Sequence, residues 1–433
     1  MKHKLFLLLG LLTSNMLFAQ ETKTLTLKEA ITFSLKNNHI LKLNEAKIAS
    51  AKSYIKEALD RQLPDANVTG SYIYLPLNPK VDLKIGSGSN PPEIKQVMYT
   101  MVNTSLPIFA GGKIRYGIES AKYLEQATQL DAENDKMGVV LNTMNACINL
   151  FKAYQAIELV NENLKQSQQR VKDFTNLEKN GLLARNDLMK SKLQNSQIEL
   201  AQLDAESNYK TACVNMNIMM GLSESTLLIP DKSGLSLPTE IKSLEDYEAL
   251  AFLNRKDVNA VSIRKKVAVL AVKSAESDLY PSIALTGGYV AADIPKLFSV
   301  YNAINIGVGI KYNIASLWKN KPHVEQALAN MAQVEQSELA LDDKIKMQLN
   351  QAYQSYVLSI KKIEVYETAV LQAAENYRIT KNKHDNALTT TSELLDADVF
   401  LLQSKLSVTN AKADSYLAYI NLLYSAGLLT ELN

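Results

Sequence analysis

Two acidic side chains, Glu393 and Asp396, are the first candidates for chemistry in this sequence. They are three residues apart, so on a helix they share one face. They also stand at the start of a long helical pattern, where carboxylates interact favourably with the partial positive charge of a helix N-terminus. From the residues alone this electrostatic role is the favoured interpretation, because acidic residues are common in a first helical turn.

Combinations of residues typical of enzymes do not occur in the sequence. The three histidines outside the N-terminal segment, His39, His323 and His384, are far apart and on different predicted elements. This distribution disfavours a metal site or a histidine-dependent triad. Gly307 and Gly309 lie inside an alternating strand pattern rather than between a strand and a helix, unlike a dinucleotide-binding loop. The sequence therefore predicts neither an enzyme nor a cofactor.

The acidic pair follows one of two similar turns between long helical patterns. Asp187 in the first turn and Glu393 in the second occupy equivalent positions, 206 residues apart. Repetition of this kind predicts two structural repeats, each with a helix, a β-hairpin and two long helices. We expect the first repeat over residues 20–221, a linker over 222–243 and the second repeat over 244–433.

Long helices dominate each predicted repeat. Apolar residues recur at steps of three and four through residues 113–178, which is coiled-coil spacing. At 1.5 Å per residue, this helix would be roughly 100 Å long. A second long helix is predicted to return over 185–220, and another antiparallel pair over 322–424. Glycine and proline are nearly absent from these segments, as unbroken helices require.

Four segments rich in Val, Ile, Thr and Tyr are predicted strands, at residues 64–75, 97–108, 281–292 and 301–314. A helix over 25–61 precedes the first of them. The fourth strand alternates, with one apolar face formed by Ile304, Ile306, Val308 and Ile310. Such a face suits either the lipid side of a membrane barrel or one face of a soluble sandwich, and this feature alone leaves both open.

The N-terminal segment has the order of a secretory signal. Lys2 and Lys4 precede an apolar run, and Ala19 is the expected cleavage point, so residues 1–19 are predicted to be a signal peptide. Removal of both lysines leaves equal numbers of basic and acidic residues, which argues against a nucleic-acid partner. No later apolar stretch reaches about 20 residues, so a membrane contact would have to use strands.

Two cysteines, Cys147 and Cys213, fall inside helical patterns. Cys147 lies on an apolar stripe, which favours a small buried hydrophobic residue. Sequence spacing leaves a disulfide between them open.

Four strands in one chain leave two open edges, and an open sheet cannot span hydrocarbon because its edge N–H and C=O groups would be unpaired. Several chains would therefore have to close one barrel. The sequence resembles the TolC family of outer-membrane efflux and secretion channels. The resemblance rests on residues 106–112 (LPIFAGG), 180–182 (NGL) with Asp187, and 393–397 (ELLDA), and on the repeat order along the whole mature chain.

The resemblance implies a mainly α-helical protein with a membrane β-barrel portion. It implies a homotrimer, in which four strands per chain form a twelve-stranded barrel in outer-membrane lipid and the long helices form an α-barrel across the periplasm. The 222–243 linker and the chain ends would form an equatorial region. A periplasmic adaptor (membrane fusion) protein and an inner-membrane transporter would be partners.

The implied function is a passive, gated exit duct from periplasm to exterior, in a tripartite efflux pump or a type I secretion system. An exported coiled-coil structural or tethering protein of the cell envelope is the alternative that the helices alone would permit.

The resemblance also assigns roles to individual positions. Glu393 and Asp396 match the acidic ring that constricts the pore at the periplasmic tip, although the first position is usually Asp. The arginine and tyrosine that latch the closed tip correspond to Thr389 and His384, so that latch is absent or rebuilt. The expected adaptor contacts lie in the two turns, at Asn180, Gly181, Leu182, Asn386, Ala387 and Leu388. The expected lipid-facing residues are Ile304, Ile306, Val308 and Ile310.

Overall fold

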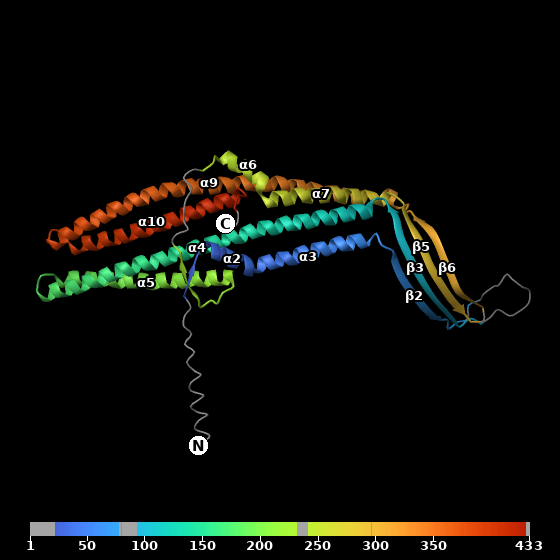
Figure 1. The fold of residues 1–433 in the computed structure, drawn as a ribbon, viewed down its shortest axis with the longest axis horizontal. Coiled ribbons are helices and arrows are strands. Elements are labelled where there is room, and N and C mark those ends of the chain that lie inside the picture. The colour runs from blue at the N-terminus through green and yellow to red at the C-terminus, as the bar shows by residue number, and fades with distance from the viewer. Residues whose placement is uncertain (1–21, 78, 80–92, 232–240, 296, 430–433) are drawn as a thin grey trace, which may run out of the picture. The chain divides into compact units, whose positions relative to one another are not determined.

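The structure is a computed structural model that describes residues 22–77, 79, 93–231, 241–295 and 297–429 (Figure 1). The predicted signal peptide, most of the loop between the first two strands and part of the predicted linker lie outside the described residues. The chain divides into two compact units. Unit 1 comprises residues 1–43, 132–256 and 343–433, and unit 2 comprises residues 44–131 and 257–342.

Unit 2 contains one antiparallel sheet of four strands, in the order β2-β3-β5-β6 (Figure 1). The sheet is open, because β2 and β6 each have a partner on one side only among the described residues. The predicted strands are confirmed, except that the fourth begins before residue 301 and ends at Lys311 rather than Ile314. It ends there because the chain turns, with Ser316 N–H donating to Asn313 O at 2.9 Å. The strands are β2 (Asp65–Tyr74), β3 (Gln96–Ala110), β5 (Ser282–Ile294) and β6 (Phe298–Lys311).

Two features shape the end of β3. Pro107 cannot donate a ladder hydrogen bond, and the pairing of β3 with β5 shifts register between Pro107 and Phe109. Gly111 then adopts φ +62°, and a Cβ there would lie 2.6 Å from Ser277 O. Only glycine allows both this conformation and this approach.

The helical part of unit 2 includes residues of four helices. They are α3 (His39–Asp60), α4 (Lys113–Lys179), α7 (Lys256–Glu276) and α9 (Lys321–Asp385), with the short η1 (Ser277–Leu279) and α8 (Ser316–Lys319) between strands and helices. Ion pairs join neighbouring helices: Arg264 of α7 pairs with Asp131 of α4, and Lys265 of α7 pairs with Glu338 of α9 at 2.9 Å.

Unit 1 is built around the two helical hairpins. It contains α2 (Leu27–Asn37), α5 (Arg185–Met220), α6 (Leu244–Asn254), α10 (Thr391–Ser425), the remaining residues of α4 and α9, and the first residues of α3 and α7. The strands β1 (Thr22–Leu25) and β4 (Leu227–Pro230) form a separate parallel pair. One buried cluster joins α2, α4 and α10 through Ile31, Met144 and Ile420. A second joins α4, α5, β1 and β4 through Leu150, Met216, Leu25 and Leu228. Apolar side chains from far-apart segments thus hold the hairpins together.

The single helix predicted over 25–61 is wrong, because Asn38 divides it into α2 and α3. Asn38 has extended backbone angles (φ −65°, ψ 128°), and its side-chain Oδ1 accepts from Ile40 N–H at 2.8 Å. An asparagine side chain that bonds the local backbone competes with the helical pattern. The predicted capping box is confirmed, since Thr26 Oγ1 accepts from Glu29 N–H and Glu29 Oε2 accepts from Thr26 N–H. Arg255 divides α6 from α7 in the same conformation (φ −65°, ψ 129°).

The predicted long helices are confirmed. The helix expected over 113–178 is α4, with 67 residues, and the one expected over 185–220 is α5. Cys147 and Cys213 are both buried and both free, so the buried role expected for Cys147 is confirmed and they form no disulfide. Among the helices that the structure describes, none has the length and apolar character needed to cross a membrane.

Candidate functional site

The first turn, between α4 and α5, is a Schellman motif. Leu182 N–H donates to Leu177 O at 2.8 Å and Gly181 N–H donates to Glu178 O at 2.9 Å, while Gly181 has φ +70°. A Cβ at Gly181 would have no atom within 4 Å, so glycine is favoured here by conformation alone. Leu182 is 74% exposed. The turn therefore presents backbone and one large apolar side chain to the surroundings of the chain.

The second turn, between α9 and α10, has the same geometry with a different residue. Leu388 N–H donates to Lys383 O at 2.8 Å and Ala387 N–H donates to His384 O at 2.9 Å. Ala387 has φ +57°, a left-handed conformation that costs a residue with a Cβ about 1–2 kcal/mol. Leu388 is 75% exposed, nearly the same as Leu182.

A buried cluster joins the two hairpins next to the turns. Phe174 of α4, Leu188 of α5 and Leu394 of α10 are buried together. His384 stacks on Phe174, with ring centroids 5.4 Å apart and planes 19° apart, and its Nε2 lies 3.3 Å from Thr391 Oγ1. The residue at the expected tyrosine latch position thus contacts both α4 and the start of α10.

Polar contacts between the two hairpins lie close to this cluster. Lys190 Nζ of α5 donates to Ser392 Oγ of α10 at 3.0 Å and lies 3.5 Å from Asp187. Arg170 of α4 forms a 2.7 Å ion pair with Asp398 of α10, with side chains 9% and 2% exposed. Asn163 Nδ2 donates to the other carboxylate oxygen of Asp398 at 3.2 Å.

The candidate acidic residues lie in the first two turns of α10. Thr390 caps the helix, its Oγ1 accepting from Glu393 N–H at 3.3 Å. Glu393 and Asp396 are both exposed, and among the described residues neither carboxylate has a hydrogen bond or ion pair. Asp187, at the position equivalent to Glu393, is instead paired with Lys190. The two turns therefore differ here: among the described residues, Asp187 after the first turn is paired, whereas Glu393 after the second is not.

Sequence reasoning missed Arg170, Asp398 and Lys190. A signal for two of them was present: Asp398 lies four residues after Leu394, and Arg170 lies four residues before Phe174. Each is a charged residue on the apolar stripe of its helix, and such a residue is almost never fully buried unless it is paired.

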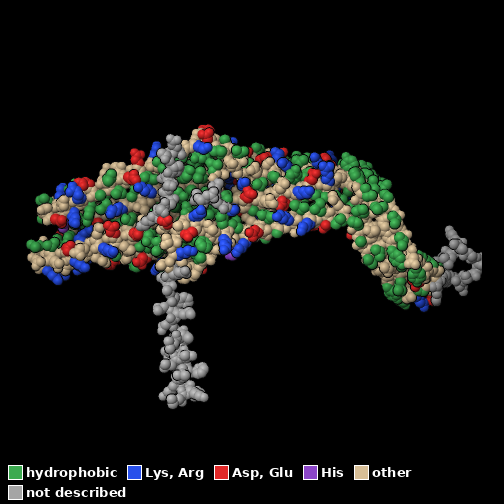
Figure 2. Space-filling view, viewed as in Figure 1, with side chains coloured by type: hydrophobic (Ala, Val, Ile, Leu, Met, Phe, Trp, Pro, Cys, Tyr) green, Lys and Arg blue, Asp and Glu red, His purple; other side chains and the backbone are tan. Residues whose placement is uncertain are grey.

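The candidate lipid-facing residues share one face of β6. Ile304, Ile306, Val308 and Ile310 are between 64% and 81% exposed. On the face shown in Figure 2, hydrophobic side chains cover much of the sheet, whereas charged side chains are spread mainly over the helices. A soluble protein rarely exposes a contiguous apolar surface of this kind without an interaction site.

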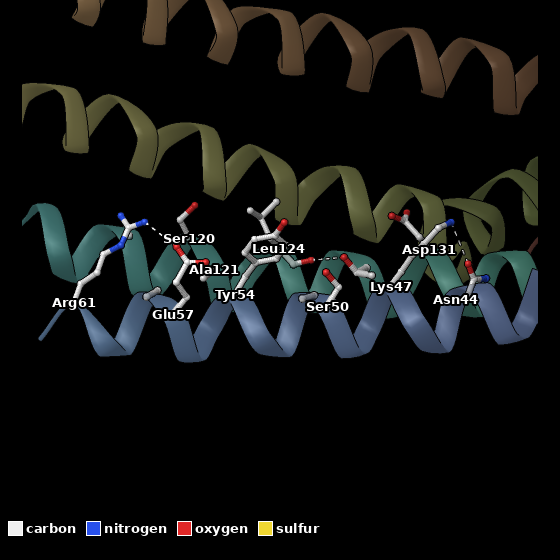
Figure 3. Close-up of a pocket in the computed structure, with 14 residues that line it drawn as sticks. Asn44, Lys47, Ser50, Tyr54, Glu57, Arg61, Ser120, Ala121, Leu124 and Asp131 are labelled. Carbon is white, nitrogen blue, oxygen red and sulfur yellow. Dashed lines mark hydrogen bonds and ion pairs between the residues drawn. The ribbon is translucent and has the colours of Figure 1, made fainter. Parts of the chain in front are cut away.

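A groove of about 610 Å³ lies between α3 and α4 in unit 2 (Figure 3). Small side chains line it, including Ala51, Ala58 and Ala121, together with Tyr54 and Leu124. Its charged side chains already have partners: Glu57 pairs with Arg61, Lys47 donates to Asn44, and Asp131 pairs with Arg264. The groove offers a packing surface and no reactive group.

The comparisons with known proteins agree with this architecture. The family model described as outer membrane efflux protein matches residues 30–222 and 249–428. The chain is 23% identical to the outer membrane protein TolC of Vibrio cholerae over 386 residues, covering 85% of this chain and 83% of the relative.

Solved structures show the same fold. The outer membrane protein VceC of Vibrio cholerae has a TM-score of 0.76 at 18% identity, covering 93% of this chain and 96% of the other. The outer membrane channel CmeC of Campylobacter jejuni has a TM-score of 0.79 at 17% identity, covering 93% and 85%. Proteins of this kind are channels of the outer membrane that extend into the periplasm, and they are not enzymes. The family match spans most of the sequence, and the chain therefore belongs to the outer membrane efflux protein family.

Proposed function

We propose that this protein is the outer-membrane channel of a tripartite efflux pump or a type I secretion system. In this function it is a passive, gated exit duct, and an inner-membrane transporter drives the substrate. The observation that carries the proposal is the sheet of unit 2, which combines two edges that no described strand pairs with an exposed apolar face on β6. Neither feature is of use to a soluble tether.

The active form is proposed to be a homotrimer. Unpaired N–H and C=O groups on β2 and β6 would be too costly in hydrocarbon, so each edge needs a partner. Pairing β6 of one chain with β2 of the next closes a twelve-stranded barrel with no free edge. Ile304, Ile306, Val308 and Ile310 then face lipid, and the two sequence repeats supply one hairpin each.

Each segment of the chain has a proposed role in export, assembly or docking. Residues 1–19 direct export and are removed, residues 20–221 and 244–433 form the two repeats, and residues 222–243 cross the equatorial region. The two turns contact a periplasmic adaptor protein through Asn180, Gly181 and Leu182, and through Asn386, Ala387 and Leu388. Exposed Leu182 and Leu388 at equivalent points support this, because apolar side chains on rigid turns suit docking to a helical-hairpin partner.

The gate is proposed to be a ring of Glu393 and Asp396. Both are exposed and have no partner among the residues that the structure describes, and threefold symmetry would bring six carboxylates around one axis. Rings of acidic side chains select cations.

The test is to isolate the protein from the outer-membrane fraction and record its conductance in planar bilayers. A trimer that dissociates only on heating and forms discrete cation-selective channels is expected. A monomer in the soluble fraction that forms no channels would instead identify a coiled-coil tether.

A further inference from the structure

The buried pair of Arg170 and Asp398 joins two helices that are distant in sequence. Arg170 donates to Asp398 Oδ2 at 2.7 Å, and Asn163 donates to Oδ1 at 3.2 Å. Both carboxylate oxygens of Asp398 on α10 are therefore bound by side chains of α4. The only comparably short ion pair between these helices that the structure describes, Lys152 with Asp414 at 2.7 Å, is much more exposed.

This buried pair is poorly explained as a source of stability. Removing two charges from water carries a large desolvation cost, and a packed apolar pair of similar volume is often as stable or more stable. The guanidinium is also incompletely satisfied, since Arg170 Nη1 is buried without a hydrogen-bond partner among the described residues. The best attested use of buried polar groups between helices is to fix their register.

Asp398 is well placed to fix the register of the proposed gate. It follows Asp396 by two residues, about 3 Å along the helix axis and roughly 200° around it. Asp398 is 2% exposed and faces α4, whereas Asp396 is exposed on the other side. A slip of α10 by one residue would move each gate carboxylate by about 1.5 Å along the axis and rotate it by about 100°.

Near the second turn, α9 contacts the first hairpin through side chains that are only partly buried, chiefly His384, which stacks on Phe174. Between residues 360 and 385, α9 has no buried residue. Its buried residues, such as Leu349 and Tyr356, all come earlier. Among the described residues near the second turn, the buried ones of this hairpin thus all belong to α10.

We propose that Arg170 and Asp398, together with Asn163, are positioning residues that set the register of α10 on α4 and so the height and direction of Glu393 and Asp396. This inference rests on the proposed gate. The pair acts through helix position and does not itself line the pore.

The test replaces the pair without leaving a buried unpaired charge. Arg170→Leu/Asp398→Leu is compared with Lys152→Leu/Asp414→Leu, which removes the exposed pair between the same helices. Arg170→Lys keeps a cation and is the conservative variant. Trimer melting temperature, single-channel conductance and block by hexaamminecobalt(III) from the periplasmic side are measured for each. If the double-leucine protein does not assemble, Arg170→Gln/Asp398→Asn replaces it in the same measurements.

We expect all variants to form trimers, with the melting temperature of the double-leucine variant equal to that of the wild type or higher. Its half-blocking cobalt concentration should rise at least tenfold, with several conductance levels in place of one. The exposed-pair control and Arg170→Lys should stay within twofold of the wild type. A merely structural pair predicts the reverse, a lower melting temperature with unchanged block.

A second readout does not depend on the gate. Lys190 Nζ and Ser392 Oγ are 3.0 Å apart, so Lys190→Cys/Ser392→Cys in a Cys147→Ala/Cys213→Ala background reports the position of α10 through cross-linking by a short bismaleimide. The double-leucine substitution should reduce the cross-linked fraction at least threefold.

The two proposals can fail separately. If Glu393→Ala/Asp396→Ala alone left the block by hexaamminecobalt(III) unchanged, the gate proposal would be refuted. The cross-linking would then test by itself whether the buried pair sets the register of α10. Wild-type cross-linking in the double-leucine variant would refute the register proposal whatever the gate residues are.

Discussion

Gly181 and Ala387 adopt the same left-handed backbone conformation at equivalent points of the two turns, with φ of +70° and +57°. In both turns the next residue donates to the carbonyl five positions earlier. The same backbone conformation is therefore adopted by Gly181, which tolerates it, and by Ala387, in which it is strained.

Ala387→Gly is expected to stabilise the protein by about 0.5–1 kcal/mol per chain, because glycine removes the strain at positive φ and loses part of the gain to unfolded-state entropy. Gly181→Ala should destabilise it by about 1 kcal/mol, since no neighbouring atom obstructs a Cβ there and only the conformation is unfavourable. Denaturant unfolding followed by circular dichroism measures both. Shifts of the same sign would contradict this account.

Replacing the exposed leucines of the turns should interrupt export without affecting assembly. Leu182→Asp and Leu388→Asp place a charge where an apolar contact with the adaptor is proposed, and each should weaken adaptor capture at least tenfold. Leu182→Met and Leu388→Met are the matched controls, because methionine keeps the apolar surface. Copurification with the adaptor and trimer migration are measured side by side. Normal capture by both aspartate variants would place the contact elsewhere.

The apolar face of β6 should not accept a charge. Ile306→Lys is expected to cost about 2–4 kcal/mol if the side chain lies near the bilayer midplane. Asn305→Lys, one residue away on the other face of the strand, should be tolerated. The yield of folded trimer from membranes compares the two. Equal losses would show that this face does not contact lipid.

Neutralising the proposed gate should change ion selectivity. Glu393→Gln/Asp396→Asn keeps the size of both side chains and removes their charge, so cation selectivity and block by trivalent cations should both fall while trimer yield is unchanged. Single-channel reversal potentials in a salt gradient measure the selectivity. If selectivity and block persist, these carboxylates serve only the N-terminus of α10.

Cys147 should make stability fall at alkaline pH. Burial raises the pKa of this thiol from 9.0 to about 11. Because its pKa is higher in the folded chain than in the unfolded chain, its contribution is fully present below pH 9 and is lost as the pH rises from about 9 to about 11. The loss should be about 2–3 kcal/mol.

The difference between wild type and Cys147→Ala isolates this effect, because tyrosines such as Tyr416 also have a pKa raised by burial and titrate in both proteins. Unfolding free energies measured at pH 8 and pH 11 should differ more in the wild type. An equal pH dependence in the two proteins would rule out the buried thiol as the cause.

The sequence predicted the elements of the fold well where a long pattern specified them. The helix expected over 113–178 appears as Lys113–Lys179, because many periodic apolar positions along it all favour the same element. The division at Asn38 was missed because it depends on one extended residue, whose side chain bonds the local backbone in place of a continued helix. The periodicity on either side of it is undisturbed.

The candidate site was predicted only in part. The two turns and the positions of Glu393 and Asp396 could be located, since a break between long helices is a local signal. The pairing of Arg170 with Asp398 could not, because it joins residues 228 positions apart and depends on how two hairpins pack. An aspartate on an apolar stripe indicates that some partner exists, but only the tertiary structure says which one.

The two edges of the sheet that no described strand pairs have a consequence for each newly made chain before it assembles. An unassembled chain exposes β2 and β6 as templates for any extended segment, so the correct neighbour competes with aggregation. If closure requires three chains, its rate depends on the local concentration of chains, whereas folding of the helical hairpins does not. Expression level and periplasmic chaperones would then decide how much protein reaches its final state, and mutations at the edges would act through yield rather than through the activity of assembled protein.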